Sequence, residues 1–418
     1  MDIERIACRL AAIGTSAVLL GALGCQSSGS SSNTATSDAA PSAQPASNRS
    51  ALADNRDYAG LSSRVEDATI RHADWAELGY RWDWAARPLV SSGEELQHVD
   101  FGDRVIITQD TGSWLTVLDT ATGRREWTLE AANNLSTFMG NAVIGNDVLF
   151  SASRAQVYGF ELRTGNTLLS MSPTRVISSR PLVVGPIMIA GSPADRVQAL
   201  RVLDNAGNAL TGSLREGLPI WEYRVNGTIT ATPVLMNVDD QDIVAVVSDG
   251  GDVLFLRPSS GATTGRAKIA GGVSVDPVTD GEVLYVASLD QSVYAYTTKG
   301  ERLWRRRTGD RLTNAPVYHE FAVILTIPSE GLTSLSAFTG EPQWVNDQLQ
   351  GEVIATRAGD LIVWDQRRRL LSRVQASTGD IIASFGMPDF ERVIAPDLGD
   401  GPIYGITDRG AIIAFRTR

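Results

Sequence analysis

The sequence predicts an all-β protein: a single eight-bladed β-propeller of four-stranded antiparallel blades, with the ring closed by an N-terminal strand. Three observations support this prediction. A turn glycine recurs about every 40 residues, short apolar strands fill each interval, and the last repeat lacks an outermost strand that the segment near residue 80 can supply. Repeats of about 40 residues that contain several short strands are typical of propeller blades.

The segment before the repeats, residues 1–57, has the composition of a leader and a tether. Two early arginines precede an apolar run at residues 10–23, which is too short for a transmembrane helix and fits a signal peptide. The run ends at Gly24-Cys25, which resembles a bacterial lipobox, so we predict that residues 1–24 are removed and that Cys25 is lipidated. An ordinary signal peptide with an incidental cysteine is the alternative.

Residues 25–57 are rich in Ser, Ala, Asn and Pro and show no hydrophobic periodicity, which predicts a disordered, flexible tether. The only two cysteines of the chain are Cys8, in the leader, and Cys25, at its end. The body is therefore expected to have no disulfide, no thiolate metal site and no cysteine nucleophile. We expect the lipid anchor alone to hold the protein at the membrane, in the cell envelope and facing the periplasm from the outer membrane.

The next segment, residues 58–78, is predicted to be a helical lead-in to the ring. Ser63 and Glu66 have the spacing of a capping box, in which each side chain accepts a hydrogen bond from the other residue's backbone. The apolar residues expected to pack this segment onto the ring are Val65, Ile70, Trp75 and Leu78.

The propeller itself is assigned to residues 79–418. The turn glycines are Gly123, Gly165, Gly207, Gly261, Gly300, Gly340 and Gly379. They are separated by 42, 42, 54, 39, 40 and 39 residues, and each precedes a predicted outer strand. Glycine adopts the left-handed conformation of such hairpins without a steric penalty.

A second marker is a proline expected at the start of each blade, where its missing N–H costs no ladder hydrogen bond. It occurs in Arg87-Pro88, Arg180-Pro181, Thr232-Pro233, Asp276-Pro277, Ala315-Pro316 and Ala395-Pro396. The eighth copy ends at Arg418 without an outermost strand, and residues 80–85 have no preceding strands of their own. We therefore expect residues 80–85 to complete the last blade and remove its open edge.

The pattern Thr-Gly-x-x-x-Trp at residues 122–127 and 339–344, with Lys for Thr at 299–304, resembles the pyrroloquinoline-quinone-type propeller repeat. Together with the leader and the tether, it resembles the BamB family of outer-membrane assembly lipoproteins. That resemblance implies a non-catalytic scaffold that binds a protein partner during outer-membrane β-barrel assembly. It also implies a partner contact on a blade-to-blade loop, for which Arg311 and Leu312 are the nearest counterparts.

Trp127, Trp304 and Trp344 are interpreted as packing residues between blades, with an aromatic ligand cage as the alternative. The arginine runs at residues 305–307 and 367–369 are interpreted as solvated positions. The net charge of −11 and the lack of a basic domain argue against nucleic acid as a partner.

Catalysis is not expected. Quinone-dependent relatives use an adjacent cysteine pair, a tryptophan floor and a metal with carboxylate ligands, and the body contains no cysteine. The three histidines are scattered, so no catalytic residue, cofactor or metal ligand is assigned. The acidic segment at residues 237–241 faintly resembles a calcium loop, but it lacks the usual glycine and is interpreted as a solvated turn.

The third blade contains an insertion of about ten residues between Gly207 and Trp221. A neutral surface loop is one interpretation, because lengthening a loop costs only about 0.6 kcal/mol per doubling. The other is a second partner contact through Leu210, Leu214 and Leu218. For the whole protein, the alternative to a monomeric scaffold is a sensor propeller that binds a saccharide or cell-wall fragment; a quinone-dependent dehydrogenase is less favoured.

Overall fold

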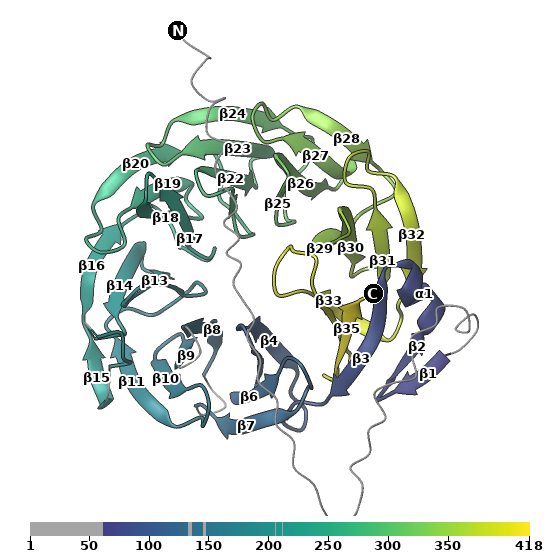
Figure 1. Cartoon of the computed structure of the whole chain (residues 1–418). Coiled ribbons are helices and arrows are strands. Elements are labelled where there is room, and N and C mark those ends of the chain that lie inside the picture. The colour runs from purple at the N-terminus through teal and green to yellow at the C-terminus, as the bar shows by residue number, and fades with distance from the viewer. Residues whose placement is uncertain (1–61, 133–135, 145–147, 205, 211) are drawn as a thin grey trace, which may run out of the picture. The chain divides into compact units, whose positions relative to one another are not determined.

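A computed structural model describes residues 62–132, 136–144, 148–204, 206–210 and 212–418. Seven four-stranded sheets and one five-stranded sheet stand around a common axis and form a closed ring (Figure 1). The eight-bladed propeller predicted from the glycine spacing is therefore confirmed. Cys25 and the rest of the proposed leader and tether lie outside the described residues.

In the first four blades the strands follow one another from the centre of the ring outward. Blade 1 comprises β4 (Leu96–Phe101), β5 (Val105–Asp110), β6 (Trp114–Asp119) and β7 (Arg125–Glu130). Blade 2 comprises β8 (Phe138–Ile144), β9 (Val148–Ser153), β10 (Val157–Glu161), β11 (Thr167–Pro173) and, outside β11, β15 (Gly212–Gly217). Blade 3 comprises β12 (Leu182–Val184), β13 (Ile187–Ser192), β14 (Arg196–Arg201) and β16 (Pro219–Arg224). Blade 4 comprises β17 (Val234–Val238), β18 (Gln241–Val247), β19 (Asp252–Leu256) and β20 (Thr263–Lys268).

The other four blades have the same order. Blade 5 comprises β21 (Val278–Thr279), β22 (Val283–Ser288), β23 (Ser292–Thr297) and β24 (Arg302–Arg307). Blade 6 comprises β25 (Val317–His319), β26 (Ala322–Ile327), β27 (Gly331–Ser336) and β28 (Pro342–Asn346). Blade 7 comprises β29 (Glu352–Arg357), β30 (Asp360–Asp365), β31 (Leu370–Val374) and β32 (Ile381–Gly386). Blade 8 comprises β33 (Phe390–Ile394), β34 (Ile403–Thr407), β35 (Ile412–Thr417) and β3 (Tyr80–Ala86).

The ring closes as the sequence predicts. Strand β3 pairs antiparallel with β35, from Tyr80 opposite Thr417 to Ala86 opposite Ile412. The N-terminal strand thus supplies the outer strand that the C-terminal blade lacks, and β35 has no open edge. In Figure 1 the purple β3 lies beside the yellow β35.

The hydrophobic core is divided among the boundaries between blades. Eight clusters of buried apolar side chains are present, and each boundary between neighbouring blades contains one. Second and third strands are the most deeply buried, as in β26, where every residue is buried. Because both faces of each sheet pack on a neighbour, these strands read as continuous apolar runs.

Five tryptophans connect each outer strand to the following blade. Trp84, Trp127, Trp221, Trp304 and Trp344 each donate an indole N–H hydrogen bond, 2.7–3.0 Å long, to a main-chain oxygen three residues before the next blade's turn glycine. All seven predicted turn glycines have a positive φ, from 67° to 85°. A side chain at Gly123 would place its Cβ 2.3 Å from the Trp84 ring. Glycine is therefore required both for the turn and for the close approach of the indole, and the packing interpretation of these tryptophans is confirmed.

The proline marker is only partly correct. Pro181, Pro233, Pro277 and Pro316 each immediately precede an innermost strand. Pro88 instead lies in the long connection before β4, and Pro396 follows the innermost strand β33. Both positions lack a ladder hydrogen bond to donate, so proline is tolerated there for the same physical reason.

The predicted helix at Ser63 is wrong. Residues 62–71 form a β-hairpin, β1 (Ser62–Val65) and β2 (Ala68–Arg71), and the helix α1 (His72–Glu77) begins later. Glu66 has a φ of 52° in the turn of this hairpin, which is incompatible with the capping box. Contacts distant in sequence stabilise the hairpin, because the Thr69 N–H donates to Asp389 at 2.8 Å.

The expected packing of the lead-in onto the ring is nonetheless present. Ile70, Trp75 and Leu78 are fully buried, or nearly so, in the cluster between blades 7 and 8, with Val65 packed against it. The Trp75 ring stacks on Phe415 with a centroid separation of 3.4 Å. Figure 1 shows β1, β2 and α1 on the outside of the ring, beside β3 and β32.

The antiparallel order defines two faces of the ring. The face that we call the connection face carries the loops between second and third strands and the connections between blades. The opposite face, which we call the hairpin face, carries the turns between first and second strands and the turns that contain the seven glycines.

Candidate functional site

The predicted contact at Arg311 and Leu312 lies on the connection face, in the loop from β24 to β25. The Asp310 carboxylate accepts a hydrogen bond from the Ser329 N–H at 2.8 Å, which fixes the loop against blade 6. Arg311 is exposed, but Leu312 is fully buried in the core between blades 5 and 6. The expectation for Leu312 is therefore corrected: it is a packing residue that presents no surface to a partner.

Arg311 has neighbours that sequence reasoning set aside. Arg307, at the end of β24, and Arg367, between β30 and β31, are also exposed on the connection face. Within the described part of the chain, the side chains of Arg307, Arg311 and Arg367 have no hydrogen-bond or ion-pair partner. We call these three residues the arginine surface.

Hydrogen bonds between loops make the arginine surface continuous. Asp310 contacts Ser329 as described, and Gln350 Nε2 donates to the Pro328 oxygen at 3.4 Å. Arg368 then donates to the Gln348 oxygen at 2.8 Å, which brings the loop of blade 7 into the same run. The other arginines of the two runs are neutralised by carboxylates: Arg305 by Asp290, Arg306 by Glu330, Arg368 by Asp365 and Arg369 by Asp408. The sequence showed the two runs but not that they share a face.

The predicted insertion of the third blade is not a free loop. Its residues form β15, which pairs in parallel with β11 and adds a fifth strand to blade 2. Leu210 is partly buried against the core between blades 2 and 3, whereas Leu218 is 68% exposed. The Leu214 side chain lies outside the described part of the structure. Of the three leucines, Leu218 alone is shown to present a large apolar surface.

A polar network joins the innermost strands of blades 1, 2 and 3. The buried Asp100 carboxylate accepts hydrogen bonds from the Asn141 backbone N–H at 3.2 Å and the Asn141 side-chain amide at 2.8 Å, and it also contacts the Arg180 guanidinium. Burying a carboxylate is costly unless it is paired and hydrogen-bonded, and these donors meet that requirement. The network is best explained as a structural connection between blades.

His98 lies beside this network, with its Nε2 3.1 Å from the Phe138 main-chain oxygen. Burial lowers the pKa of His98 from its ordinary value, although the Phe138 carbonyl and the Asp100 carboxylate oppose that shift. The neutral imidazole, with a proton on Nε2, can donate to this oxygen. Nothing adjacent provides a nucleophile for it to activate.

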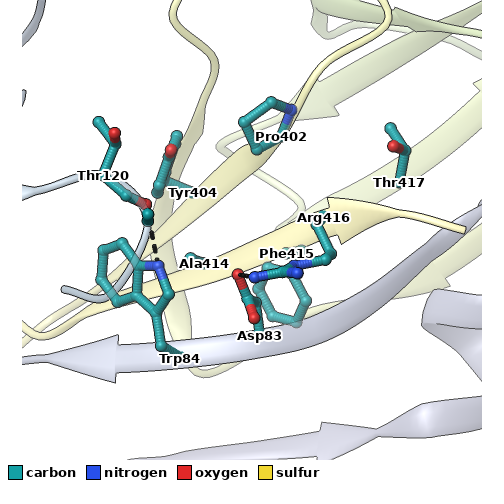
Figure 2. A pocket seen from close by; sticks show the side chains of 10 residues that line it. Asp83, Trp84, Thr120, Pro402, Tyr404, Ala414, Phe415, Arg416 and Thr417 are labelled. Carbon is teal, nitrogen blue, oxygen red and sulfur yellow. Dashed lines mark hydrogen bonds and ion pairs between the residues drawn. The ribbon is translucent and has the colours of Figure 1, made fainter. Parts of the chain in front are cut away.

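A cavity of about 220 Å³ lies where the ring closes between blades 8 and 1 (Figure 2). Its polar groups are already paired: the Trp84 indole donates to the Thr120 oxygen, and Arg416 contacts Asp83. Burial raises the pKa of Tyr404 to about 12, so its hydroxyl stays protonated. Typical small-molecule sites occupy about 300–1,000 Å³, and this smaller cavity offers a ligand no unpaired charge.

The acidic segment at residues 237–241 forms the tight turn between β17 and β18. Asp239 and Asp240 are its two central residues, with φ of 53° and 59°, and Asn237 donates to Asp242 at 3.0 Å. Among the described residues, no group of three or more His, Cys, Asp or Glu side chains is arranged to hold a metal ion. None of the described helices has the length and apolar character needed to cross a bilayer.

The repeat pattern of the ring matches one family of known proteins. A family model described as "Outer membrane protein assembly factor BamB" matches residues 111–272 and 211–416. No curated protein matches the chain in sequence.

Two solved structures are similar in shape. The computationally designed Ika8 protein has a TM-score of 0.61 at 12% identity, covering 79% of this chain and 98% of its own. BamB from Moraxella catarrhalis has a TM-score of 0.46 at 16% identity, covering 85% of this chain and 96% of its own. The likeness to the designed protein concerns the fold alone.

Proposed function

This chain belongs to the BamB family of outer-membrane protein assembly factors, and from that premise we propose that it is a non-catalytic scaffold for outer-membrane β-barrel assembly. The observation that carries the proposal is the family match, which spans residues 111–416 and so includes most of the ring. The predicted lipid anchor at Cys25 would tether this ring to the outer membrane on the periplasmic side.

The arginine surface is the part of the molecule that we assign to the assembly partner. The whole chain has a net charge of −11, yet Arg307, Arg311 and Arg367 are exposed on one face without a carboxylate partner among the described residues. Arginine is enriched in protein interfaces and binds carboxylates through two parallel hydrogen bonds. An acidic surface on the partner would therefore complement this face in charge.

The internal packing of the ring supports a scaffold. Each boundary between blades is filled by its own core cluster, and tryptophan–carbonyl hydrogen bonds connect five of the boundaries. A rigid ring holds the connection-face loops in fixed positions, so binding would cost little ordering entropy.

Affinity purification tests the proposal. The full-length chain should be isolated from native cell envelope after gentle crosslinking, and its partners identified by mass spectrometry. We expect a component of the β-barrel assembly machinery to be recovered in stoichiometric amounts. Its absence, with the chain intact and membrane-bound, would contradict the assembly function.

A charge reversal then tests the assigned surface. Arg311→Glu should reduce recovery of the assembly component about tenfold or more, because the new carboxylate would face the acidic partner. Lys299→Glu is the matched control, since Lys299 is also exposed but lies on the hairpin face. Equal loss in both variants, or in neither, would show that the arginine surface is not the contact.

A further inference from the structure

Two phenylalanine side chains are stacked in solvent on the hairpin face of blade 6. Phe321 is 61% exposed and Phe338 is 71% exposed, and their ring centroids lie 5.7 Å apart at an interplanar angle of 22°. They come from separate turns, joined by a hydrogen bond from the Ala337 N–H to the Phe321 oxygen at 2.8 Å. We call these two residues the phenylalanine pair.

Phe321 occupies a backbone position that disfavours it. It is the second central residue of the two-residue turn between β25 and β26, where Glu320 has a φ of 44° and Phe321 a φ of 65°. Such turns favour Asn, Asp and Gly, and a bulky residue at positive φ is an outlier.

The equivalent turns of two other blades follow the ordinary preference. Asp240 occupies this position in blade 4 and Gly359 occupies it in blade 7. Blade 6 therefore carries an unfavourable backbone conformation that displays an aromatic ring, and the ring remains mostly exposed. Burial within the chain does not offset this cost, which is the pattern found where strain serves binding.

The pair is surrounded by negative charge. The hairpin-face turns of blades 5, 6 and 7 carry six exposed carboxylates: Asp280, Glu282, Glu301, Glu320, Glu341 and Asp380. The exposed cations beside them are Lys299, in the turn, and Arg302, at the start of β24. An apolar centre inside an acidic rim attracts a segment that combines an apolar side chain with positive charge.

We propose that the phenylalanine pair is a docking site for a protein segment that carries an apolar anchor residue flanked by lysine or arginine. The acidic rim opposes an anionic lipid surface, which attracts basic segments instead. It also opposes a second copy of this chain, because a two-fold contact would place identical acidic rims together. The site lies on the face opposite the arginine surface, so it does not depend on the proposed assembly contact.

Peptide binding to the purified full-length chain tests the proposal. The probe is an array of peptides about twelve residues long, in which one Leu, Phe or Trp is flanked by several Lys or Arg residues. Matched arrays carry Glu in place of the cations, or Ser in place of the apolar residue. We expect binding only when both features are present, with affinity that rises with the number of cations and falls with salt.

Three variants connect the binding to the pair. Phe338→Ser should weaken binding of the basic peptides by about 30-fold, as expected for an interface hot spot. Leu218→Ser is the matched control, since Leu218 is similarly exposed but belongs to blade 3's connection. Phe321→Gly should abolish binding while the melting temperature stays constant or rises, because glycine relieves the positive φ.

Several outcomes would overturn the proposal. Equal binding of the acidic array, or retained binding in Phe338→Ser, would remove the basis for a basic, apolar partner. A large fall in melting temperature for Phe321→Gly would show that the pair serves packing. Dimers that dissociate on Phe338→Ser would assign the site to a second copy, and phosphatidylglycerol vesicles bound through the pair would assign it to lipid.

Discussion

The indole N–H of Trp84 donates a hydrogen bond to the Thr120 main-chain oxygen at 3.0 Å and joins the strand that completes blade 8 to blade 1 (Figure 2). The same contact recurs at four other boundaries, so the ring closes by the interaction that also joins its consecutive blades. The N-terminal strand therefore serves as an ordinary outer strand of the repeat.

Alanine at two turn glycines should separate backbone strain from tryptophan packing. Gly123→Ala places a Cβ 2.3 Å from the Trp84 ring, whereas Gly207→Ala meets nothing within 4 Å, and both residues have positive φ. We expect a loss of about 1–2 kcal/mol for Gly207→Ala and about 1–3 kcal/mol more for Gly123→Ala. Denaturant unfolding measures both, and equal losses would show that the indole contact adds nothing.

Leu312 and Arg311 should respond oppositely to substitution. Leu312→Ala leaves a cavity between blades 5 and 6 and should reduce the free energy of unfolding by about 2–5 kcal/mol. Arg311→Ala removes an exposed side chain without a described partner and should change stability by less than about 0.5 kcal/mol. If thermal unfolding showed no loss for Leu312→Ala, the buried placement of this leucine would be incorrect.

Shortening residues 208–218 to a tight turn should destabilise the protein. The segment contains β15, so its removal exposes the edge of β11 and the Met171 side chain that packs near Gly217. We expect a lower melting temperature and concentration-dependent aggregation, measured by light scattering. An unchanged melting transition would indicate that the fifth strand contributes no stability.

The low pKa of His98 predicts that stability falls in acid. Because the folded-state pKa lies below the unfolded value, the unfolded chain takes up a proton first as the pH decreases below about 6.5. The stability due to neutral His98 is present above that pH and is lost as the pH falls through the folded pKa. His98→Gln should flatten the slope of unfolding free energy between about pH 7 and pH 5, and an unchanged slope would exclude the histidine as its source.

Substitution of the predicted lipidation site should release the protein from membranes. Cys25→Ser removes the thiol that would be acylated, so the chain should move from the membrane fraction to the soluble fraction. Circular dichroism should show unchanged folding, because every described core cluster lies within the ring and its lead-in. Undiminished membrane retention would contradict the lipid anchor.

The sequence alone determined the architecture, because a propeller repeats one local solution. The glycine positions, the tryptophan four residues after many of them and the missing last strand were visible without coordinates, and each reflects a constraint within about 40 residues. The assignment of Trp127, Trp304 and Trp344 to packing followed from the same periodicity.

The tertiary structure decided whatever depends on contacts between distant segments. Residues 62–71 match a capping box locally, but pairing of this segment with Asp389 and Gly386 favours a hairpin. Leu312 and Arg311 are adjacent in sequence, yet one side chain enters the core and the other enters solvent. The ring likewise brings Arg311 and Arg367 to one face and stacks Phe321 on Phe338. Local patterns specify the backbone conformation of each strand, whereas the direction and neighbours of a loop side chain depend on packing between blades.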